Sequence, residues 1–279
     1  MNETDSSFFQ TVDNFLDKYP VSGIFSIIIG CIWLLLRFYF FVTGIYRGFK
    51  QFLWPSCRTL DFFNLYGEYV IITAASNGIG FQFGKQFLKR GHSVVLIDYD
   101  AEQLTTAKEE LQKYVQNGRD LMIVAIEKNY DEAYQNVQRQ FENIKGRIGI
   151  LINNANVTLS KEEYLKYSIE QISDTIRCNI ISVLMITKKI LPFMVQNEKG
   201  HILNITSPTG CQPISSSGFF DATKYFVDFF GKTLLAEYAI KNITVQTLNP
   251  GFIVAEGDTA NSRMVVQTLQ LGPPKINLL

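Results

Sequence analysis

Short apolar runs alternate with longer amphipathic segments between residues 68 and 250 of this chain. The short runs are rich in Val, Ile and Leu, which is typical of strands buried on both faces of a parallel sheet. The longer segments repeat apolar residues at helical spacing. This order predicts an α/β fold, a doubly wound parallel sheet with helices on both faces. The expected strands are 69–73, 93–98, 120–125, 148–153, 201–206 and 244–249, and the expected helices are 81–90, 101–116, 131–144, 170–196 and 221–240.

A different pattern occupies the N-terminal part, where residues 21–46 are apolar except for Arg37 and small polar residues. At about 1.5 Å per residue, a helix over this stretch is long enough to cross a bilayer. A central arginine costs about 2.5–3.5 kcal/mol on insertion scales, but the apolar neighbours offset this cost and the side chain can snorkel. We therefore expect an N-terminal tail over 1–20, a transmembrane helix as membrane anchor over 21–46, a linker over 47–66 and a catalytic-type domain over 67–279.

The charges on the two sides of this stretch differ in sign, since acidic residues precede it and basic residues follow it. By the positive-inside rule, the larger domain then faces the cytosol. A cleaved signal peptide would need a basic start, and a mitochondrial transit peptide would be poor in acids. A hairpin or monotopic insertion interrupted near Gly30 or Arg37 stays open as an alternative. The flanking residues are Glu3, Asp5, Asp13 and Asp17 before the stretch, and Arg47, Lys50 and Arg58 after it.

The overall composition argues against several classes of function. The chain carries 26 basic and 26 acidic residues, so no net charge favours binding to nucleic acid. Its four cysteines have neither zinc-site nor disulfide-framework spacing. With two histidines in the chain, neither a histidine-based metal site nor a Ser-His triad is expected.

A small-residue turn, TAASNGIG, joins the first expected strand to the first expected helix. Such a turn lets backbone amides and a helix N-terminus approach a pyrophosphate, although close packing alone also favours small residues. The second strand ends in Asp98, whose carboxylate can bind a ribose diol and would repel a 2′-phosphate, favouring NAD over NADP. An ordinary turn residue at the end of a strand is the alternative for Asp98. The candidate cofactor residues of the turn are Thr73, Ser76, Asn77, Gly78, Ile79 and Gly80.

Five motifs in order carry a family resemblance over about residues 67–254. TAASNGIG resembles the TGxxxGxG of short-chain dehydrogenases/reductases, LINNAN at 151–156 resembles their NNAG, and Asn179 follows at the interval of their active-site asparagine. Ser207 and FDATK at 220–224 stand at the spacing of the family's serine and YxxxK, and Pro250-Gly251 resembles its PG. The segments ILPFMVQNEKGHILNIT and ATKYFVDFF are similar in sequence to the family branch that contains the very-long-chain 3-oxoacyl-CoA reductases and the type 12 17β-hydroxysteroid dehydrogenases.

The resemblance implies a Rossmann-like fold, an NAD or NADP cofactor and three retained catalytic roles. In the family, serine positions the substrate carbonyl, asparagine supports a proton relay, and lysine lowers the pKa of the tyrosine and binds the nicotinamide ribose. These roles fall on Ser207, Asn179 and Lys224, whereas Phe220 occupies the place of the tyrosine. Phenylalanine has no proton to give, and loss of a general acid/base typically costs around 10²–10⁴ in rate. The resemblance also assigns cofactor contacts to Asn153, Ala155, Lys224, Pro250 and Gly251.

Other positions depart from the family pattern as well. Ala74 replaces the first motif glycine, Ile126 stands where an adenine-contacting aspartate is usual, and Asn156 replaces the glycine of NNAG, where we expect left-handed backbone. After Gly251 the chain has 28 residues, too few for the family's substrate-covering segment and seventh strand, so we expect a fold truncated at the C-terminus with an incomplete lid.

Three functions are compatible with these observations. The first is a catalytically impaired, cofactor-binding membrane protein resembling the inactive hydroxysteroid dehydrogenase-like proteins. The second is a working reductase or dehydrogenase of a lipophilic substrate, a 3-oxoacyl-CoA or a steroid, that takes its proton from water or from another hydroxyl, that of Ser207 or one of Ser215–Ser217. The third is a membrane scaffold that binds no nucleotide. The resemblance favours the endoplasmic reticulum membrane, with mitochondria second, and pairing of two copies through the domain's helices.

Overall fold

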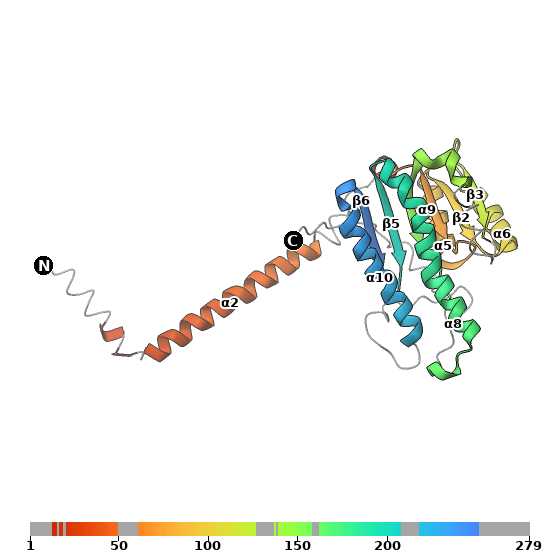
Figure 1. Cartoon of the computed structure of the whole chain (residues 1–279). Helices are drawn as coiled ribbons and strands as arrows, with labels where there is room; N and C mark the ends of the chain where they lie inside the picture. The colour runs from red at the N-terminus through yellow and green to blue at the C-terminus, as the bar shows by residue number, and fades with distance from the viewer. Residues whose placement is uncertain are drawn as a thin grey trace. The chain divides into compact units, whose positions relative to one another are not determined.

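The computed structural model describes residues 13–15, 17–18, 21–49, 61–126, 137, 139–157, 162–207 and 218–250. The chain forms two compact units, Met1–Leu60 and Asp61–Leu279, and each unit is considered by itself. The first contains the long helix α2 and the second contains the sheet (Figure 1). Gly251 and the predicted truncated end, residues 251–279, lie outside the described residues.

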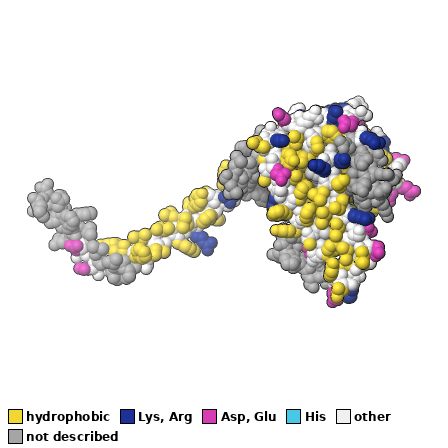
Figure 2. All heavy atoms as spheres, viewed as in Figure 1, with side chains coloured by type: hydrophobic (Ala, Val, Ile, Leu, Met, Phe, Trp, Pro, Cys, Tyr) yellow, Lys and Arg dark blue, Asp and Glu magenta, His cyan; other side chains and the backbone are white. Residues whose placement is uncertain are grey.

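Helix α2, Val21–Gly48, covers the whole stretch expected to be a membrane anchor. Its large apolar side chains, including Phe25, Leu35 and Phe40, are exposed along its length (Figure 2). The guanidinium of Arg37 lies 4.9 Å from the centre of the Trp33 ring, one helical turn away. By length and composition α2 can cross a membrane, as can the helical stretch Ile169–Gln196, although 44% of the most apolar part of that second stretch is buried in the protein.

The second unit is built on one parallel six-stranded sheet with the order β3-β2-β1-β4-β5-β6. The order reverses between β1 and β4, which makes the carboxyl ends of these two strands the switch point of the sheet. The strands β1, β2 and β4 have the predicted bounds, whereas β3, β5 and β6 differ by one residue at their ends. The strands are β1 Tyr69–Thr73, β2 Ser93–Asp98, β3 Leu121–Ala125, β4 Ile148–Asn153, β5 Gly200–Ile205 and β6 Ile243–Leu248.

Helices connect the strands as the alternating pattern predicts. The expected helix 170–196 is one continuous helical run, but it contains a π-helical turn, η4, in its first half. Most of the expected helix 131–144 lies outside the described residues. The helices are α4 Phe62–Leu65, α5 Gly78–Lys89, α6 Ala101–Gln112, η2 Glu142–Arg147, η3 Tyr164–Lys166, α8 Ile169–Ile176, η4 Arg177–Ile181, α9 Ser182–Gln196, α10 Gly218–Tyr238 and η6 Ala239–Lys241.

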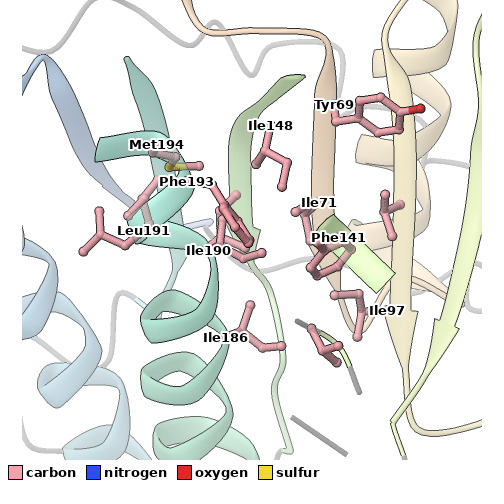
Figure 3. Close-up of a cluster of buried hydrophobic side chains, with 14 of the residues drawn as sticks. Tyr69, Ile71, Ile97, Phe141, Ile148, Ile186, Ile190, Leu191, Phe193 and Met194 are labelled. Atoms are coloured by element: carbon pink, nitrogen blue, oxygen red, sulfur yellow. The ribbon is translucent and has the colours of Figure 1, made fainter. Parts of the chain in front are cut away.

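The core has two layers, one on each face of the sheet, because successive strand residues point to opposite faces. Ile71 of β1 packs in the cluster that contains Ile186 and Ile190 of α9 (Figure 3). The next residue, Ile72, packs in the cluster that contains Phe83 of α5 on the other face. Full burial of such a side chain is worth about 1.5–3 kcal/mol, so these two layers hold the sheet edge described next in place.

Candidate active site

The turn between β1 and α5 is tight, and its backbone is left-handed at two positions. Ala74 has φ 49° and Gly78 has φ 56°. A Cβ added to Gly80 would lie 2.4 Å from the carbonyl oxygen of Ala74, so a side chain cannot fit there without moving the turn. A Cβ added to Gly78 would meet no atom within 4 Å. The turn therefore packs against the protein at Gly80 and leaves space around Gly78 at the start of α5.

Asp98 at the end of β2 is buried and holds this turn. Its Oδ2 accepts hydrogen bonds from the amide nitrogen of Ser76 at 3.1 Å and from Ser76 Oγ at 2.6 Å, and its Oδ1 accepts from the amide of Tyr99 at 2.8 Å. An ionised carboxylate has about four acceptor positions, so these three bonds leave room for one more donor. Asn77 is the N-cap residue of α5 but makes no side-chain cap hydrogen bond, and its Nδ2 donates to Gln103 Oε1 at 3.1 Å.

Ile126 has a structural place beside Asp98. Its amide nitrogen donates a 2.8 Å hydrogen bond to the backbone carbonyl oxygen of Asp98, and its partly buried side chain packs against the core. Where the family resemblance leads one to expect a hydrogen-bonding carboxylate, this chain offers an apolar side chain. The chain therefore lacks that hydrogen-bonding side chain, but the backbone hydrogen bond from Ile126 to Asp98 is present.

The second motif ties the end of β4 to the end of β1. Asn154 Nδ2 donates to the carbonyl oxygens of Thr73 at 3.2 Å and Ala74 at 2.9 Å. Thr73 Oγ1 accepts from the amides of Asn154 at 2.9 Å and Ala155 at 3.1 Å. Sequence reasoning missed Asn154, although two successive asparagines at a strand end must point to opposite faces of the sheet.

Asn153 points away from that turn into the layer between the sheet and α9. Its Nδ2 donates to Thr187 Oγ1 at 3.1 Å and to Asn204 Oδ1 at 2.9 Å, and the side chain is buried. Its Oδ1 is buried without a hydrogen-bond partner, as is Asn204 Nδ2. Asn153 therefore supports the switch point from behind, whereas Ala155 lies at its partly open side.

Asn179 sits in the π-helical turn η4, a feature that often accompanies functional sites. Its Oδ1 accepts from the amide of Val157 at 2.8 Å, and its Nδ2 donates to Thr223 Oγ1 at 3.0 Å. Thr223 Oγ1 in turn donates to the carbonyl oxygen of Phe220 at 2.7 Å. This chain of bonds joins the β4 loop, η4 and α10, and Thr223 is a member that the sequence did not single out.

The expected left-handed backbone at Asn156 is wrong, since its φ is not among the positive values of the described residues. Asn179 bonds to both backbone groups of the neighbouring Val157. Its Oδ1 accepts from the amide nitrogen of Val157, and its Nδ2 donates to the carbonyl oxygen of Val157 at 3.3 Å. The strained conformation occurs instead at Ala74, in the first motif.

Lys224 and Phe220 lie one turn apart on α10 and face each other. Lys224 is 2% exposed, and its Nζ lies 5.8 Å from the centre of the Phe220 ring. Burial lowers the pKa of Lys224 to about 8, opposed by the nearby Cys178 thiol. Burial raises the pKa of Cys178 to about 11, and the Lys224 charge counteracts this rise. No hydrogen bond or ion pair joins Lys224 to another described residue, and the contact of its ammonium that the described residues show is the Phe220 ring.

The remaining candidate residues follow the last two strands. Ser207 comes two residues after the end of β5, and Pro250 comes two residues after the end of β6. Thr206, just before Ser207, donates from its amide to the carbonyl oxygen of Leu248 at 2.9 Å, which keeps these two strand ends together. The candidate residues on the described part of the chain thus gather along the carboxyl edge of a parallel sheet, where α/β proteins bind ligands.

Comparison with known proteins agrees with this arrangement. Residues 68–265 match the family model of the short chain dehydrogenases. Hydroxysteroid dehydrogenase-like protein 1 of Gallus gallus is 32% identical over 207 residues, which cover 74% of this chain and 61% of the relative. Very-long-chain 3-oxoacyl-CoA reductase of Anas platyrhynchos is 33% identical over 195 residues, covering 68% of this chain and 61% of the relative. The chain thus spans about three fifths of the length of these relatives.

A solved structure of similar fold is the short-chain dehydrogenase from Sphingobium yanoikuyae in complex with NADPH. It superposes with a TM-score of 0.62 and 30% sequence identity over 68% of this chain and 72% of that chain. Residues 68–265, which match the family model, include the whole sheet, the glycine-containing turn and the pair of Phe220 and Lys224. The chain therefore belongs to the short chain dehydrogenase family.

Proposed function

We propose that this protein binds a nicotinamide dinucleotide at the carboxyl edge of its sheet and is impaired in proton transfer because Phe220 stands opposite Lys224. The observation that carries the proposal is this pair, a buried lysine facing an aromatic ring without a hydroxyl. The turn residues and Asp98 would hold the dinucleotide, the substrate would meet Ser207 and Phe220, and the buried Asn179 would support them from η4.

The cofactor part of the proposal rests on space and charge. The open side of Gly78 and the start of α5 suit a pyrophosphate, because backbone amides there point toward an anion. Asp98 retains acceptor capacity for a ribose hydroxyl, and its negative charge favours NAD over NADP. The relative solved with NADPH keeps NADP open as the second choice. When bound, the nicotinamide ring supplies hydride exchange with a carbonyl or alcohol carbon.

The impairment follows from what the chain places at the reacting end. A carbonyl oxygen that accepts hydride at its carbon needs a proton, and the ring at residue 220 has none to give. Lys224 faces the Phe220 ring from the same helix, with its Nζ 5.8 Å from the ring centre, and its role in the family is to assist a tyrosine that this chain lacks. A missing general acid typically costs around 10²–10⁴ in rate.

A second candidate function is turnover of a lipophilic carbonyl substrate, a 3-oxoacyl-CoA or a steroid. The bonds from Val157 through Asn179 and Thr223 to α10 favour it, because the support of the reacting end is intact. Ser207 would then position the carbonyl or supply the proton itself. The relatives named for 3-oxoacyl-CoA reduction make this substrate class the first to assay.

For the setting of this activity, we propose that α2 anchors the protein in the endoplasmic reticulum membrane with the second unit in the cytosol. Its exposed apolar side chains support this, and so do the basic residues that follow the helix. The stacking of Arg37 on Trp33 reduces the cost of a charge within the apolar stretch. Mitochondria are the second choice.

Cofactor binding is tested by titrating the full chain in detergent with NADH and NADPH and following nucleotide fluorescence. We expect saturable binding that Asp98→Ala weakens at least tenfold, since the variant loses the charged hydrogen-bond acceptor. Glu109→Gln is the control, because it removes a carboxylate charge from an exposed position on α6. Equal binding by wild type and Asp98→Ala would contradict the assignment of Asp98.

Impairment is tested by comparing the wild type with Phe220→Tyr in the reduction of a 3-oxoacyl-CoA and of a 17-ketosteroid with either nucleotide. We expect the tyrosine variant to be faster by around 10²–10⁴ on a substrate that binds, since it restores the general acid. Wild-type turnover as fast as that of Phe220→Tyr would reject impairment and favour the second candidate function.

A further inference from the structure

Lys224 differs from an ordinary surface lysine in three respects. The residue as a whole is 2% exposed, its Nζ lies 5.8 Å from the centre of the Phe220 ring, and it forms no hydrogen bond or ion pair with another described residue. Asn179, the nearest amide side chain on η4, is turned toward Val157 and Thr223. The titratable side chain near Lys224 is the partly buried Cys178 thiol, also on η4, which stays neutral near pH 7 because its pKa is about 11.

Such surroundings favour the neutral amine, because a buried ammonium without a partner loses its hydration and gains little in return. With its pKa at about 8, roughly a fifth of Lys224 carries a free electron pair at pH 7.4, against about one in a thousand for a solvated lysine. Desolvation of this kind is how lysines become nucleophiles toward carbonyl compounds.

We propose that Lys224 is a carbonyl-capturing amine that forms a Schiff base with short aliphatic aldehydes. The ligand class follows from the site, since an uncharged molecule can approach a desolvated amine and an alkyl chain can lie against the Phe220 ring. A phenol at residue 220 would give the ammonium a polar partner and keep it protonated. The inference goes beyond the proposed function, because it requires neither bound nucleotide nor hydride transfer.

The reaction needs no oxidant or reductant. The nitrogen electron pair attacks the aldehyde carbon, a C–N bond forms, and the C=O electron pair moves to oxygen, which takes up a proton as the nitrogen loses one. The resulting carbinolamine loses water to give the imine, so that amine and aldehyde become imine and one water. The loss of water is reversible, and capture is therefore an equilibrium that depends on aldehyde concentration.

The experiment uses the full chain in detergent with propanal and sodium cyanoborohydride, which reduces an imine to a stable propylamine. Labelled peptides are quantified by mass spectrometry between pH 6 and pH 10, without nucleotide. We expect Lys224 to be labelled about tenfold faster at pH 8 than Lys188, which is exposed on α9, with a rate that levels off above a midpoint near pH 8. Labelling of Lys224 no faster than Lys188 would overturn the proposal.

Two variants test whether the missing hydroxyl at residue 220 is the cause of the reactivity of Lys224. Phe220→Tyr should slow labelling of Lys224 about tenfold at pH 8, because the hydroxyl raises the pKa of the amine, while labelling of Lys188 stays unchanged. Lys224→Arg should remove the label from this peptide and leave Lys188 as before. If Lys224→Arg does not fold, the pH profile and the tyrosine variant still decide. A tyrosine variant labelled as fast as the wild type would reject the role of the missing hydroxyl.

Discussion

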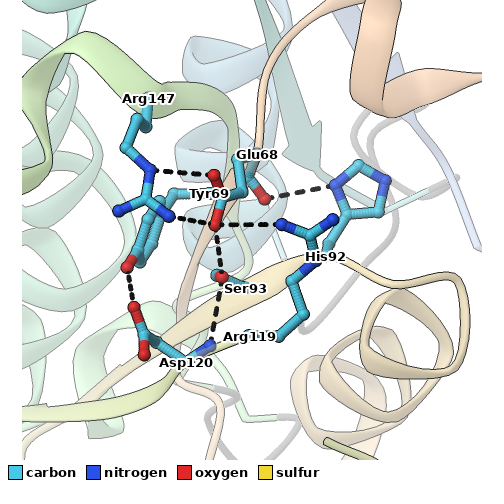
Figure 4. A network of polar contacts seen from close by, with 7 residues as sticks. All are labelled: Glu68, Tyr69, His92, Ser93, Arg119, Asp120 and Arg147. Carbon is cyan, nitrogen blue, oxygen red and sulfur yellow. Dashed lines mark hydrogen bonds and ion pairs between the residues drawn. The ribbon is translucent and has the colours of Figure 1, made fainter. Parts of the chain in front are cut away.

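Two charged side chains at opposite ends of the parallel sheet, Glu68 and Lys224, have contrasting surroundings. At the amino end, Glu68 accepts hydrogen bonds from Arg147 Nε at 2.8 Å and Ser93 Oγ at 3.0 Å, and it forms an ion pair with Arg119 at 3.3 Å (Figure 4). The Tyr69 hydroxyl donates to Asp120 in the same network. At the carboxyl end, the buried Lys224 has no such partner on the described part of the chain.

The pKa shifts record this difference. Burial opposes ionisation of Glu68, but hydrogen bonds from Arg147 and Ser93 outweigh it, so the pKa of Glu68 lies below its ordinary value. Burial lowers the pKa of Lys224 and so disfavours its charged form, whereas the charged form of Glu68 is favoured. A charge that its neighbours stabilise contributes to folding, whereas a charge that they leave uncompensated costs folding energy and is available for chemistry. We therefore interpret the amino end as structural and the carboxyl end as the site.

Replacing Glu68 should have the largest effect on stability. Glu68→Ala leaves two arginines without their carboxylate, and we expect a loss of about 3 kcal/mol in the free energy of unfolding, limited by the exposure of Arg147 and Arg119. Because the folded pKa of Glu68 is lowered, this contribution is present above the ordinary glutamate pKa and is lost as the pH falls through the folded value. Denaturant unfolding at pH 7 and at pH 3, followed on the second unit of the full chain, measures the loss of stability and its dependence on pH.

The control for this variant is Glu109→Ala, which removes an exposed carboxylate on α6. It should change stability by less than about 0.5 kcal/mol. If Glu68→Ala were equally mild, the amino-end network would not be the structural element that the comparison makes it.

Replacing Lys224 should have the opposite sign and a smaller size. Lys224→Met keeps the length of the side chain and removes the charge, and we expect a gain of about 2 kcal/mol at pH 7. Between the folded pKa of about 8 and the ordinary 10.5, the unfolded chain binds a proton that the folded chain does not, so wild-type stability rises with pH there. The advantage of Lys224→Met should therefore shrink over this window.

Urea unfolding at pH 7 and pH 10 measures this change, with Lys188→Met on α9 as the exposed control. A loss of stability in Lys224→Met at pH 7 would mean that the ammonium has a stabilising partner. It would also remove the basis for a nucleophilic amine at this position.

Much of the sheet was predictable from local pattern, and so was the edge that carries the site. Strands buried on both faces appear as continuous apolar runs, which is why β1, β2 and β4 were predicted to the residue. Asp98 and Thr73 end two of these strands, and parallel topology places strand ends on one edge. The order of elements thus locates the site without any contact being known.

The contacts within the site were not predictable, because they join residues far apart in the sequence. Asn154 bonds to Thr73 across 81 positions, and Asn179 bonds to Thr223 across 44. Local pattern also gives no sign of the π-helical turn η4 inside a helix with regular apolar spacing. Asparagine is the usual non-glycine residue in left-handed backbone, so Asn156 was expected there, whereas the tertiary bonds place the strain at Ala74.

The smallest expected effect concerns this strain. An alanine in left-handed backbone destabilises the folded protein by about 1–2 kcal/mol. Glycine removes this strain, but it destabilises the folded protein by about 0.5–1 kcal/mol because the unfolded chain gains conformational freedom. Ala74→Gly should therefore stabilise the protein by about 0.5–1 kcal/mol, measured by thermal unfolding. Ala75→Gly is the control, because Ala75 is buried and has no positive φ, so the variant should lose about 1 kcal/mol. A loss in both variants would show that Ala74 is not strained, and it would leave Lys224 alone as the costly feature of the carboxyl end.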